Sequence, residues 1–289
     1  MSLGVDLSPA IKQCNFDCLY CELAPMATVA EQTFTISVHE IIDALQPHLH
    51  DKIDVITLTA NGEPTLYPHL DELINRLNAI KGETRTLILT NSAALTDANV
   101  YKALLKLDQV KLSLDAITPE IFKKIDRPHK SIDVNALVSR VIEFSQEFKG
   151  KLFIEILFVH TLNDTLEEIA KLNDVLLRIN AARVDIGTID RPPAYPVVGV
   201  SYKELHEISL LFDSAIPIHI ASRIHAEPNN AYYSEDDILS TLSKRPLTQE
   251  DVNLLFDEQS KESLKKLLRE EKIAIKSSNN LDFFILDSK

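Results

Sequence analysis

Cys14-Asn15-Phe16-Asp17-Cys18-Leu19-Tyr20-Cys21 contains all three cysteines of this 289-residue chain. Thiolates are the usual protein ligands of iron–sulfur clusters, and three of them on one short loop can each reach a separate iron of a [4Fe–4S] cube. One iron would then have no protein ligand. The spacing therefore predicts a metal centre held by Cys14, Cys18 and Cys21.

Three other interpretations of these cysteines remain open. A structural zinc site normally has four protein ligands, so a distant histidine would have to complete it. Cys18 and Cys21 have the spacing of a thioredoxin-like pair, which would leave Cys14 without a role. The three thiols could also be unrelated and buried, although their clustering speaks against this.

A second motif follows the expected strand at residues 53–59, where the chain reads Asn61-Gly62-Glu63-Pro64. Gly62 allows a ligand to approach the backbone closely, Glu63 offers an acceptor for an ammonium group, and Pro64 fixes the turn. The same residue types are common in an ordinary loop between a strand and a helix. The motif alone therefore predicts either a ligand-binding loop or a plain connection.

The composition is that of a globular protein, with 45% hydrophobic and 25% charged residues. No apolar run approaches the roughly 20 residues that span a bilayer, and the N-terminus lacks the pattern of a signal peptide. We therefore expect no membrane association and a cytoplasmic location, which the odd number of cysteines also favours. The net charge of −13 argues against non-specific polyanion binding by the surface as a whole.

Short β-branched runs alternate with longer amphipathic ones, which is typical of an α/β protein with a parallel sheet. Strands are expected at 3–7, 53–59, 86–90, 110–116, 152–159 and 183–188. Helices are expected from Ser37, where Glu40 completes a capping box, and at 68–80 and 165–179. The cysteine loop follows the first strand, and in parallel barrels active sites lie at that edge.

The cysteine spacing, with an aromatic residue before Cys21, and Asn61-Gly62-Glu63-Pro64 one βα unit later resemble the radical S-adenosylmethionine (SAM) superfamily. The resemblance implies a partial (β/α)6 TIM-like barrel over residues 1–225. It implies that SAM chelates the open iron and that its reductive cleavage gives a 5′-deoxyadenosyl radical, which abstracts hydrogen from a substrate. An electron donor such as flavodoxin or ferredoxin would be needed.

The resemblance also implies a set of residues that contact SAM. The motif at 61–64 would meet the amino group of SAM, and side chains at the ends of the third and fourth strands would hold its carboxylate and ribose. The implied cofactor contacts are Tyr20, Asn61, Gly62, Glu63, Pro64, Asn91, Ser113 and Asp115. Ser92 departs from the Thr-Asn-Gly of many relatives. A side chain that caps the next helix is the alternative role for the last three.

Within the superfamily, Arg191-Pro192-Pro193-Ala194, Arg127-Pro128-His129 and the opening residues 2–7 resemble the wyosine-synthase-related subgroup. True wyosine synthases carry further cysteines for a second cluster, used on a tRNA guanine, and this chain has none to spare. That specific reaction is therefore not predicted. Asp190 and Arg191 are candidates for substrate contact, with a structural salt bridge as the alternative.

Two further charged features are of interest. Glu155 lies in the very apolar run 152–159 and needs a partner, so we expect it to face the barrel interior and a polar ligand. Residues 123–130 form the most basic segment of the chain. This segment could touch a phosphate-bearing substrate or be a solvated turn between helices.

The C-terminal part, residues 236–289, is expected to form a winged-helix-like domain after a linker at 226–235. Helices are predicted at 236–243, 249–256 and 261–271, followed by a hairpin from 273–276 and 281–286. This part holds 9 basic and 11 acidic residues. Phosphate binding normally needs a positive excess, so a protein-contact or substrate-presenting role is equally plausible.

Two function classes follow from the sequence. The first is a radical SAM enzyme whose unidentified substrate is a tRNA or nucleotide, a peptide or a small molecule. The second is a non-enzymatic regulator in which a cluster or zinc ion on the cysteine loop signals to the winged helix. A regulator needs no SAM pocket, so the motif at 61–64 with Ser113 and Asp115 favours the enzyme.

Overall fold

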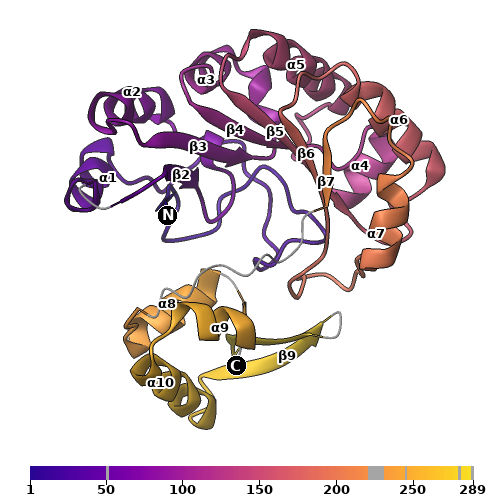
Figure 1. Cartoon of the computed structure of the whole chain (residues 1–289). Helices are drawn as coiled ribbons and strands as arrows, with labels where there is room; N and C mark the ends of the chain where they lie inside the picture. Colours follow the sequence, from indigo (N-terminus) through magenta and orange to yellow (C-terminus); the bar gives the residue numbers. More distant parts are fainter. Residues whose placement is uncertain (50–51, 221–230, 245, 279–280, 288–289) are drawn as a thin grey trace. The chain divides into compact units, whose positions relative to one another are not determined.

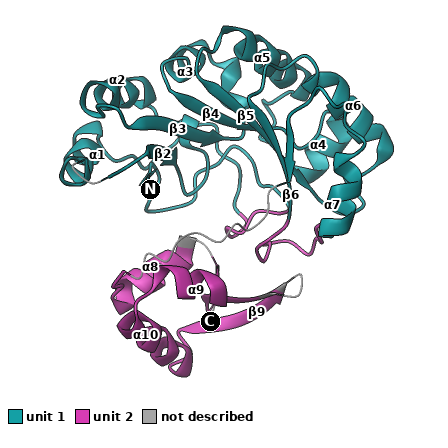
Figure 2. Ribbon diagram, in the orientation of Figure 1, with its two compact units in different colours: residues 1–19, 26–188, 200–221 teal, residues 20–25, 189–199, 222–289 magenta. Residues whose placement is uncertain are grey.

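The computed structural model describes the whole chain except residues 50–51, 221–230, 245, 279–280 and 288–289 (Figure 1). The chain forms two compact units (Figure 2). Unit 1 comprises residues 1–19, 26–188 and 200–221, and unit 2 comprises 20–25, 189–199 and 222–289. Two short segments of the predicted barrel, 20–25 and 189–199, thus group with unit 2. Of the predicted linker at 226–235, residues 226–230 lie outside the described part.

Unit 1 is built on a parallel sheet of seven strands in the order β1-β2-β3-β4-β5-β6-β7. The strands are β1 (Ser2–Asp6), β2 (Val55–Thr59), β3 (Arg85–Thr90), β4 (Gln109–Ser113), β5 (Lys151–Phe158), β6 (Arg183–Thr188) and β7 (Ile218–Ile220). The six predicted strands are confirmed. The seventh was not predicted, because three residues are too few to show an alternation.

Helices cover the outer face of this curved sheet (Figure 1). They are α1 (Val38–Leu45), α2 (Leu70–Ile80), α3 (Ala98–Leu104), α4 (Pro119–Ile125), α5 (Val134–Glu147), α6 (Leu166–Leu176) and α7 (Tyr202–Ser209). Short 3-10 helices η1 (Gln46–His48), η2 (Pro64–Leu66) and η3 (Ala93–Thr96) lie in the connections. The expected capping box of Ser37 and Glu40 begins α1.

Along each strand, successive side chains point alternately into the hydrophobic core and toward the concave face of the sheet. In β4, Val110 and Leu112 belong to the core, whereas Lys111 and Ser113 face the other side and are partly exposed. Successive side chains of a strand point to opposite faces, so the polar members of β4 to β6 gather on the face away from the helices. This alternation positions the charged residues described below.

The C-terminal part of unit 2 contains α8 (Glu235–Lys244), α9 (Gln249–Leu255) and α10 (Glu258–Arg269), then the hairpin of β9 (Ile273–Ser278) and β10 (Leu281–Leu286). The three predicted helices and the hairpin are confirmed. A two-residue strand, β8 (Leu247–Thr248), extends the hairpin into a sheet of order β8-β10-β9. These elements enclose their own core, which includes Phe256, Leu264 and Leu267. The winged-helix assignment stays a prediction.

Candidate functional site

The two sequence motifs of unit 1 are joined through their backbones. Gln13, which directly precedes the first cysteine, donates its N–H to the carbonyl of Asn61 at 2.9 Å and accepts from the N–H of Glu63 at 2.9 Å. Together these bonds form a parallel bridge between Gln13 and Gly62. The start of the cysteine loop is therefore fixed to the loop after β2.

Gly62 is required at this junction for two reasons. Its φ is +128°, a conformation that side-chain-bearing residues rarely adopt. A Cβ at this position would lie 2.0 Å from the carbonyl oxygen of Gln13. The glycine predicted to let a ligand approach thus also lets the cysteine loop approach.

Asn91, at the end of β3, connects the same two motifs through its side chain. Its Nδ2 donates to Asn15 Oδ1 at 2.6 Å and lies 3.9 Å from Cys14 Sγ. Its backbone N–H donates to Glu63 Oε2 at 2.8 Å. The structure therefore brings Cys14, the motif at 61–64 and Asn91 together.

Glu63 is directed into the protein, with a relative exposure of only 2%. Its carboxylate accepts from the N–H and hydroxyl of Thr65, the hydroxyl of Thr90 and the N–H of Asn91. Burial raises the pKa of Glu63, although these hydrogen bonds counteract it. The side chain predicted to meet an ammonium group thus holds the loops after β2 and β3 together, and Pro64 begins η2 beside it.

Ser92, which follows Asn91 in the loop after β3, has a backbone conformation that favours glycine. Ser92 has a φ of +71°, in the left-handed region, and is completely buried. Its hydroxyl donates to the carbonyl of Ser113 at 2.8 Å, which links the ends of β3 and β4. Ser92 therefore adopts a left-handed conformation and supplies one hydrogen bond between the two strand ends.

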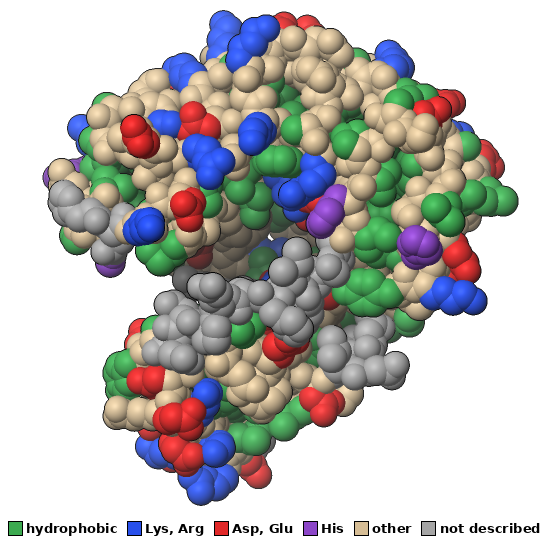
Figure 3. Space-filling model, viewed as in Figure 1, with side chains coloured by type: hydrophobic (Ala, Val, Ile, Leu, Met, Phe, Trp, Pro, Cys, Tyr) green, Lys and Arg blue, Asp and Glu red, His purple; other side chains and the backbone are tan. Residues whose placement is uncertain are grey.

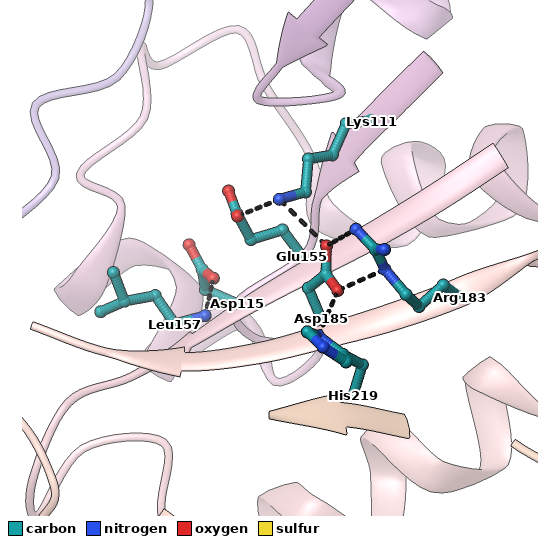
Figure 4. Close-up of polar contacts among 7 residues, drawn as sticks. All are labelled: Lys111, Asp115, Glu155, Leu157, Arg183, Asp185 and His219. Carbon is teal, nitrogen blue, oxygen red and sulfur yellow. Dashed lines mark hydrogen bonds and ion pairs between the residues drawn. The ribbon is translucent and has the colours of Figure 1, made fainter. Parts of the chain in front are cut away.

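Asp115 follows β4 and is 4% exposed. Its carboxylate accepts from the N–H of Leu157 at 2.7 Å (Figure 4). Thr118 is the N-cap of α4 and makes no side-chain capping hydrogen bond. Glu168 accepts from the N–H groups of Ile117 and Thr118, just before the helix. The hydrogen bond of Asp115 to Leu157 thus links the loop after β4 to β5.

The three cysteines are all half-buried. Cys14 Sγ accepts from the N–H of Phe16 at 3.4 Å, and Cys18 Sγ lies 3.6 Å from Asp126 Oδ1. Cys21 belongs to unit 2, where its carbonyl accepts from the N–H of Ala194 at 2.8 Å. Among the described residues, no three His, Cys, Asp or Glu side chains are gathered as metal ligands. Three thiolates without a fourth ligand are the donor set that suits a [4Fe–4S] cube with one open iron.

A row of polar residues crosses the concave face from β4 to β7. Ser113, Glu155, Asp185 and His219 stand opposite one another in the strand register. Lys111 pairs with both Glu155 and Asp185, the latter at 3.1 Å (Figure 4). The partner that Glu155 was expected to need is thus a lysine of the protein.

Asp185 is the hub of this row. Arg183 Nε lies 2.6 Å and His219 Nδ1 3.1 Å from Asp185 Oδ1. Burial alone would raise the pKa of Asp185, but Arg183 and Lys111 hold it below its usual value. Burial alone would lower the pKa of Lys111, whereas Glu155 and Asp185 raise it. The lysine is therefore a fixed cation and not a nucleophile near neutral pH.

The predicted residues of unit 2 are arranged differently. Arg191 Nη1 lies 2.9 Å from both carboxylate oxygens of Glu22, so it forms a salt bridge, the alternative that the sequence left open. Burial alone would lower the pKa of Arg191, but Glu22 raises it. Asp190 beside it is exposed, and Tyr20 is half-buried next to Cys21.

The basic side chains of α10 are largely neutralised. Lys261 pairs with Glu258, Lys265 with Glu262, and Lys266 with Glu235 and Glu270. On the face shown in Figure 3, acidic and basic side chains intermingle over this module. Neither observation favours a nucleic-acid-binding helix.

Sequence reasoning missed several members of the site. Gln13 could have been suspected from its place before Cys14, but its partners come from a distant loop. Asp185 lies in the six-residue strand β6 and His219 in the three-residue strand β7. Their grouping depends on the strand register, which the sequence did not reveal.

The chain matches the radical SAM superfamily over residues 9–175. It is 38% identical to a UPF0026 protein of Helicobacter pylori strain J99 over 287 residues, 98% of this chain and 92% of that protein. A GTP 3′,8-cyclase of Helicobacter pylori strain 26695 is 29% identical over 163 residues, 56% of this chain and 48% of the cyclase. The solved structure of Streptococcus suis SuiB bound to S-adenosylmethionine has a TM-score of 0.59 at 17% identity, covering 77% of this chain and 51% of SuiB.

These similarities concern the fold and the cofactors. The likeness to SuiB shows the fold, and the family match brings with it SAM and a [4Fe–4S] cluster as the cofactors that proteins of this family bind. The resemblance to the wyosine-synthase-related subgroup stays a prediction. No helix in the described ranges is long and apolar enough to cross a membrane.

Proposed function

The chain belongs to the radical SAM superfamily and to the UPF0026 family, and we propose that it is an enzyme that cleaves SAM reductively to start hydrogen abstraction from a substrate. The cluster and SAM would supply the radical chemistry, with the 5′-deoxyadenosyl radical as the abstracting species. The protein's own part is to hold, orient and shield these groups.

The observation that carries the proposal is the junction of Gln13 with Gly62 and of Asn91 with Asn15. A SAM site in this family has to place a ligand beside the cluster, so the loop that bears the cysteines and the loop that meets SAM must be held in one arrangement. Two backbone hydrogen bonds and one amide pair do this here.

We assign roles within this site as follows. Cys14, Cys18 and Cys21 would hold three irons. The backbone of Asn61 to Pro64 would face the amino group of SAM, because the Glu63 side chain is already engaged by Thr65, Thr90 and Asn91. The carboxylate, ribose and adenine of SAM would be contacted by the other predicted residues, Asn91, Ser113, Asp115 and Tyr20.

The substrate would lie against the polar row of the concave face. Lys111 and Arg183 offer fixed cations, Glu155 offers a carboxylate and His219 an imidazole, so a polar ligand with both donors and acceptors fits best. A nucleotide, free or in tRNA, is one such ligand, and the similarity to a GTP 3′,8-cyclase supports it. A peptide or another small polar molecule is compatible with the same row. Asp190 is an exposed candidate for further contact, whereas Arg191 is held by Glu22.

Electron paramagnetic resonance tests the SAM part of the proposal. The anaerobically reconstituted chain is reduced with dithionite, and its spectrum is recorded with and without SAM. We expect SAM to shift the signal of the reduced cluster, because it would bind the open iron. An identical spectrum with SAM at saturating concentration would overturn the assignment.

A further inference from the structure

The most basic segment of the chain lies directly against the cysteine loop. Ile125 and Asp126 accept through their carbonyls from the N–H groups of Leu19 at 2.8 Å and Asp17 at 3.1 Å. The N–H of His129 donates to the carbonyl of Asn15 at 2.7 Å. Residues 125–129 and 15–19 are thus bonded along their length, with Cys18 Sγ 3.6 Å from Asp126.

This segment presents positive charge to solvent. Lys123, Lys124 and Lys130 are exposed, and none of the three is in an ion pair within the described part of the chain. The carboxylate of Asp126 is 2% exposed and so contributes no exposed acidic group. We call these three lysines together with Arg127 the basic patch.

The basic patch borders a cavity and a strained turn. A cavity of about 540 Å³ is lined by Asp17, Met26, Lys123, Arg127 and Lys130, among others. Arg127 has a φ of +45°, which is rare for a residue with a side chain, and its guanidinium lies 3.2 Å from Asp17 Oδ2. Strained backbone of this kind persists where the surroundings hold it in place, often at functional sites.

We propose that the basic patch is the docking surface for an acidic protein that carries one electron and delivers it to the cluster. This inference rests on the proposed function, which requires a reductant. The chain as a whole is strongly acidic, with a net charge of −13, so an acidic carrier is repelled by most of the surface and attracted to this patch. In the transfer the carrier loses one electron and the cluster gains one, and no bond is made or broken at the patch.

A polyanion such as RNA would also be attracted to four cations. The position of the patch favours the electron carrier, because it is bonded to the backbone on either side of Cys18, where a short path to the cluster matters. The proposed substrate row, in contrast, uses Lys111 of β4 and Asp185 of β6, whereas the patch lies on α4 and the segment after it. The experiment below therefore also measures RNA binding, which distinguishes the two ligands.

The test compares two reductants on the reconstituted full chain without SAM. Cluster reduction by photoreduced flavodoxin, an acidic carrier, and by dithionite is followed by stopped-flow absorbance. The variant reverses three charges, Lys123→Glu with Lys124→Glu and Lys130→Glu. A matched control reverses three exposed cations at or just before the N-terminal ends of β3 and β5, Arg85→Glu with Lys149→Glu and Lys151→Glu.

We expect the cluster of the patch variant to be reduced by flavodoxin about tenfold or more slowly than that of the wild type at low salt. Its reduction by dithionite should be unchanged. The control variant should be reduced by flavodoxin at the wild-type rate. The wild-type rate with flavodoxin should fall as salt rises from about 20 to about 300 mM, since screening weakens steering. A neutral variant, Lys123→Gln with Lys124→Gln and Lys130→Gln, should give an intermediate rate.

Three results would overturn the proposal. The first is a patch variant reduced by flavodoxin at the wild-type rate. The second is an equal loss with dithionite, which would mean that the patch acts on the cluster itself. The third is loss of tRNA binding in a filter assay with flavodoxin reduction intact, which would make the patch an RNA site. Because SAM is absent, failure of SAM cleavage would refute the proposed function without touching this result.

Discussion

Gly62 lies against Gln13 so closely that a Cβ would come within 2.0 Å of its carbonyl oxygen. The contact links the residue before the first cysteine to the centre of the second motif. The two motifs, about 40 residues apart in sequence, therefore form one structural piece, and a change at either should affect both.

Gly62→Ala should disrupt this junction. The new methyl group has no space, and alanine in so sparsely populated a backbone conformation adds a cost of about 1–3 kcal/mol. We expect a lower urea midpoint and a reconstituted protein with reduced iron content. Gly4→Ala is the matched control, because a Cβ at Gly4 meets nothing within 4 Å. Equal behaviour of the two variants would show that the close approach does not matter.

Glu63→Gln should destabilise the protein rather than act on SAM alone. Both carboxylate oxygens accept hydrogen bonds, and the amide nitrogen of glutamine would face an N–H or hydroxyl donor instead. A buried donor left without an acceptor costs about 1–3 kcal/mol. Urea unfolding measures the loss, and the exposed Glu83→Gln serves as control. An unchanged midpoint with weaker SAM binding would instead favour a direct role of the carboxylate.

Asp185 should contribute to acid sensitivity. Its pKa is held below the usual value by Arg183 and Lys111 against the opposing effect of burial, so the folded state favours the carboxylate. Its contribution is complete above the ordinary pKa of about 3.9 and is lost as pH falls through the lower folded value. The stability gap between wild type and Asp185→Asn should therefore shrink on acidification from pH about 5 to about 3.

The control for this experiment is Asp174→Asn, an exposed carboxylate of α6. Its stability difference from wild type should stay small and constant over the same pH range. Urea unfolding of the metal-free chain supplies both data sets. A constant gap for Asp185→Asn would contradict the proposed stabilisation by Arg183 and Lys111.

Replacement of any one cysteine by serine should lower the iron content and the visible absorbance of the reconstituted cluster. Three ligands are the whole cysteine supply of the chain, so no other thiol can substitute. Iron analysis and absorbance spectra provide the measurement. Full iron content after replacement of Cys14, Cys18 or Cys21 would remove that residue from the ligand set.

Local patterns in the sequence were sufficient for much of the fold. The alternation in β4 predicts a strand and the capping box at Ser37 predicts the start of a helix. Both could be recognised because the residues that decide these conformations are close neighbours in the sequence. The C-terminal helices and hairpin were predictable for the same reason. The three-residue strand β7 was not, since its pairing with β6 decides its conformation.

The site was predictable in its residues but less so in their roles. Glu63 was expected to meet a ligand, yet its donors Thr90 and Asn91 come from the next strand, and no local pattern indicates that they converge on it. Likewise, the salt bridge of Arg191 with Glu22 spans 169 positions. Such contacts depend on tertiary packing, which residue spacing alone does not reveal.

The central claim is that the three cysteines and the motif at 61–64 support cleavage of SAM. The most direct measurement is mass spectrometry of 5′-deoxyadenosine after anaerobic incubation of the reconstituted chain with SAM and dithionite. We predict that 5′-deoxyadenosine forms, that it disappears on replacement of Cys14, Cys18 or Cys21, and that Gly62→Ala reduces it. A protein with a full cluster that forms no 5′-deoxyadenosine, with candidate nucleotides, tRNA or peptides present or absent, would contradict the claim.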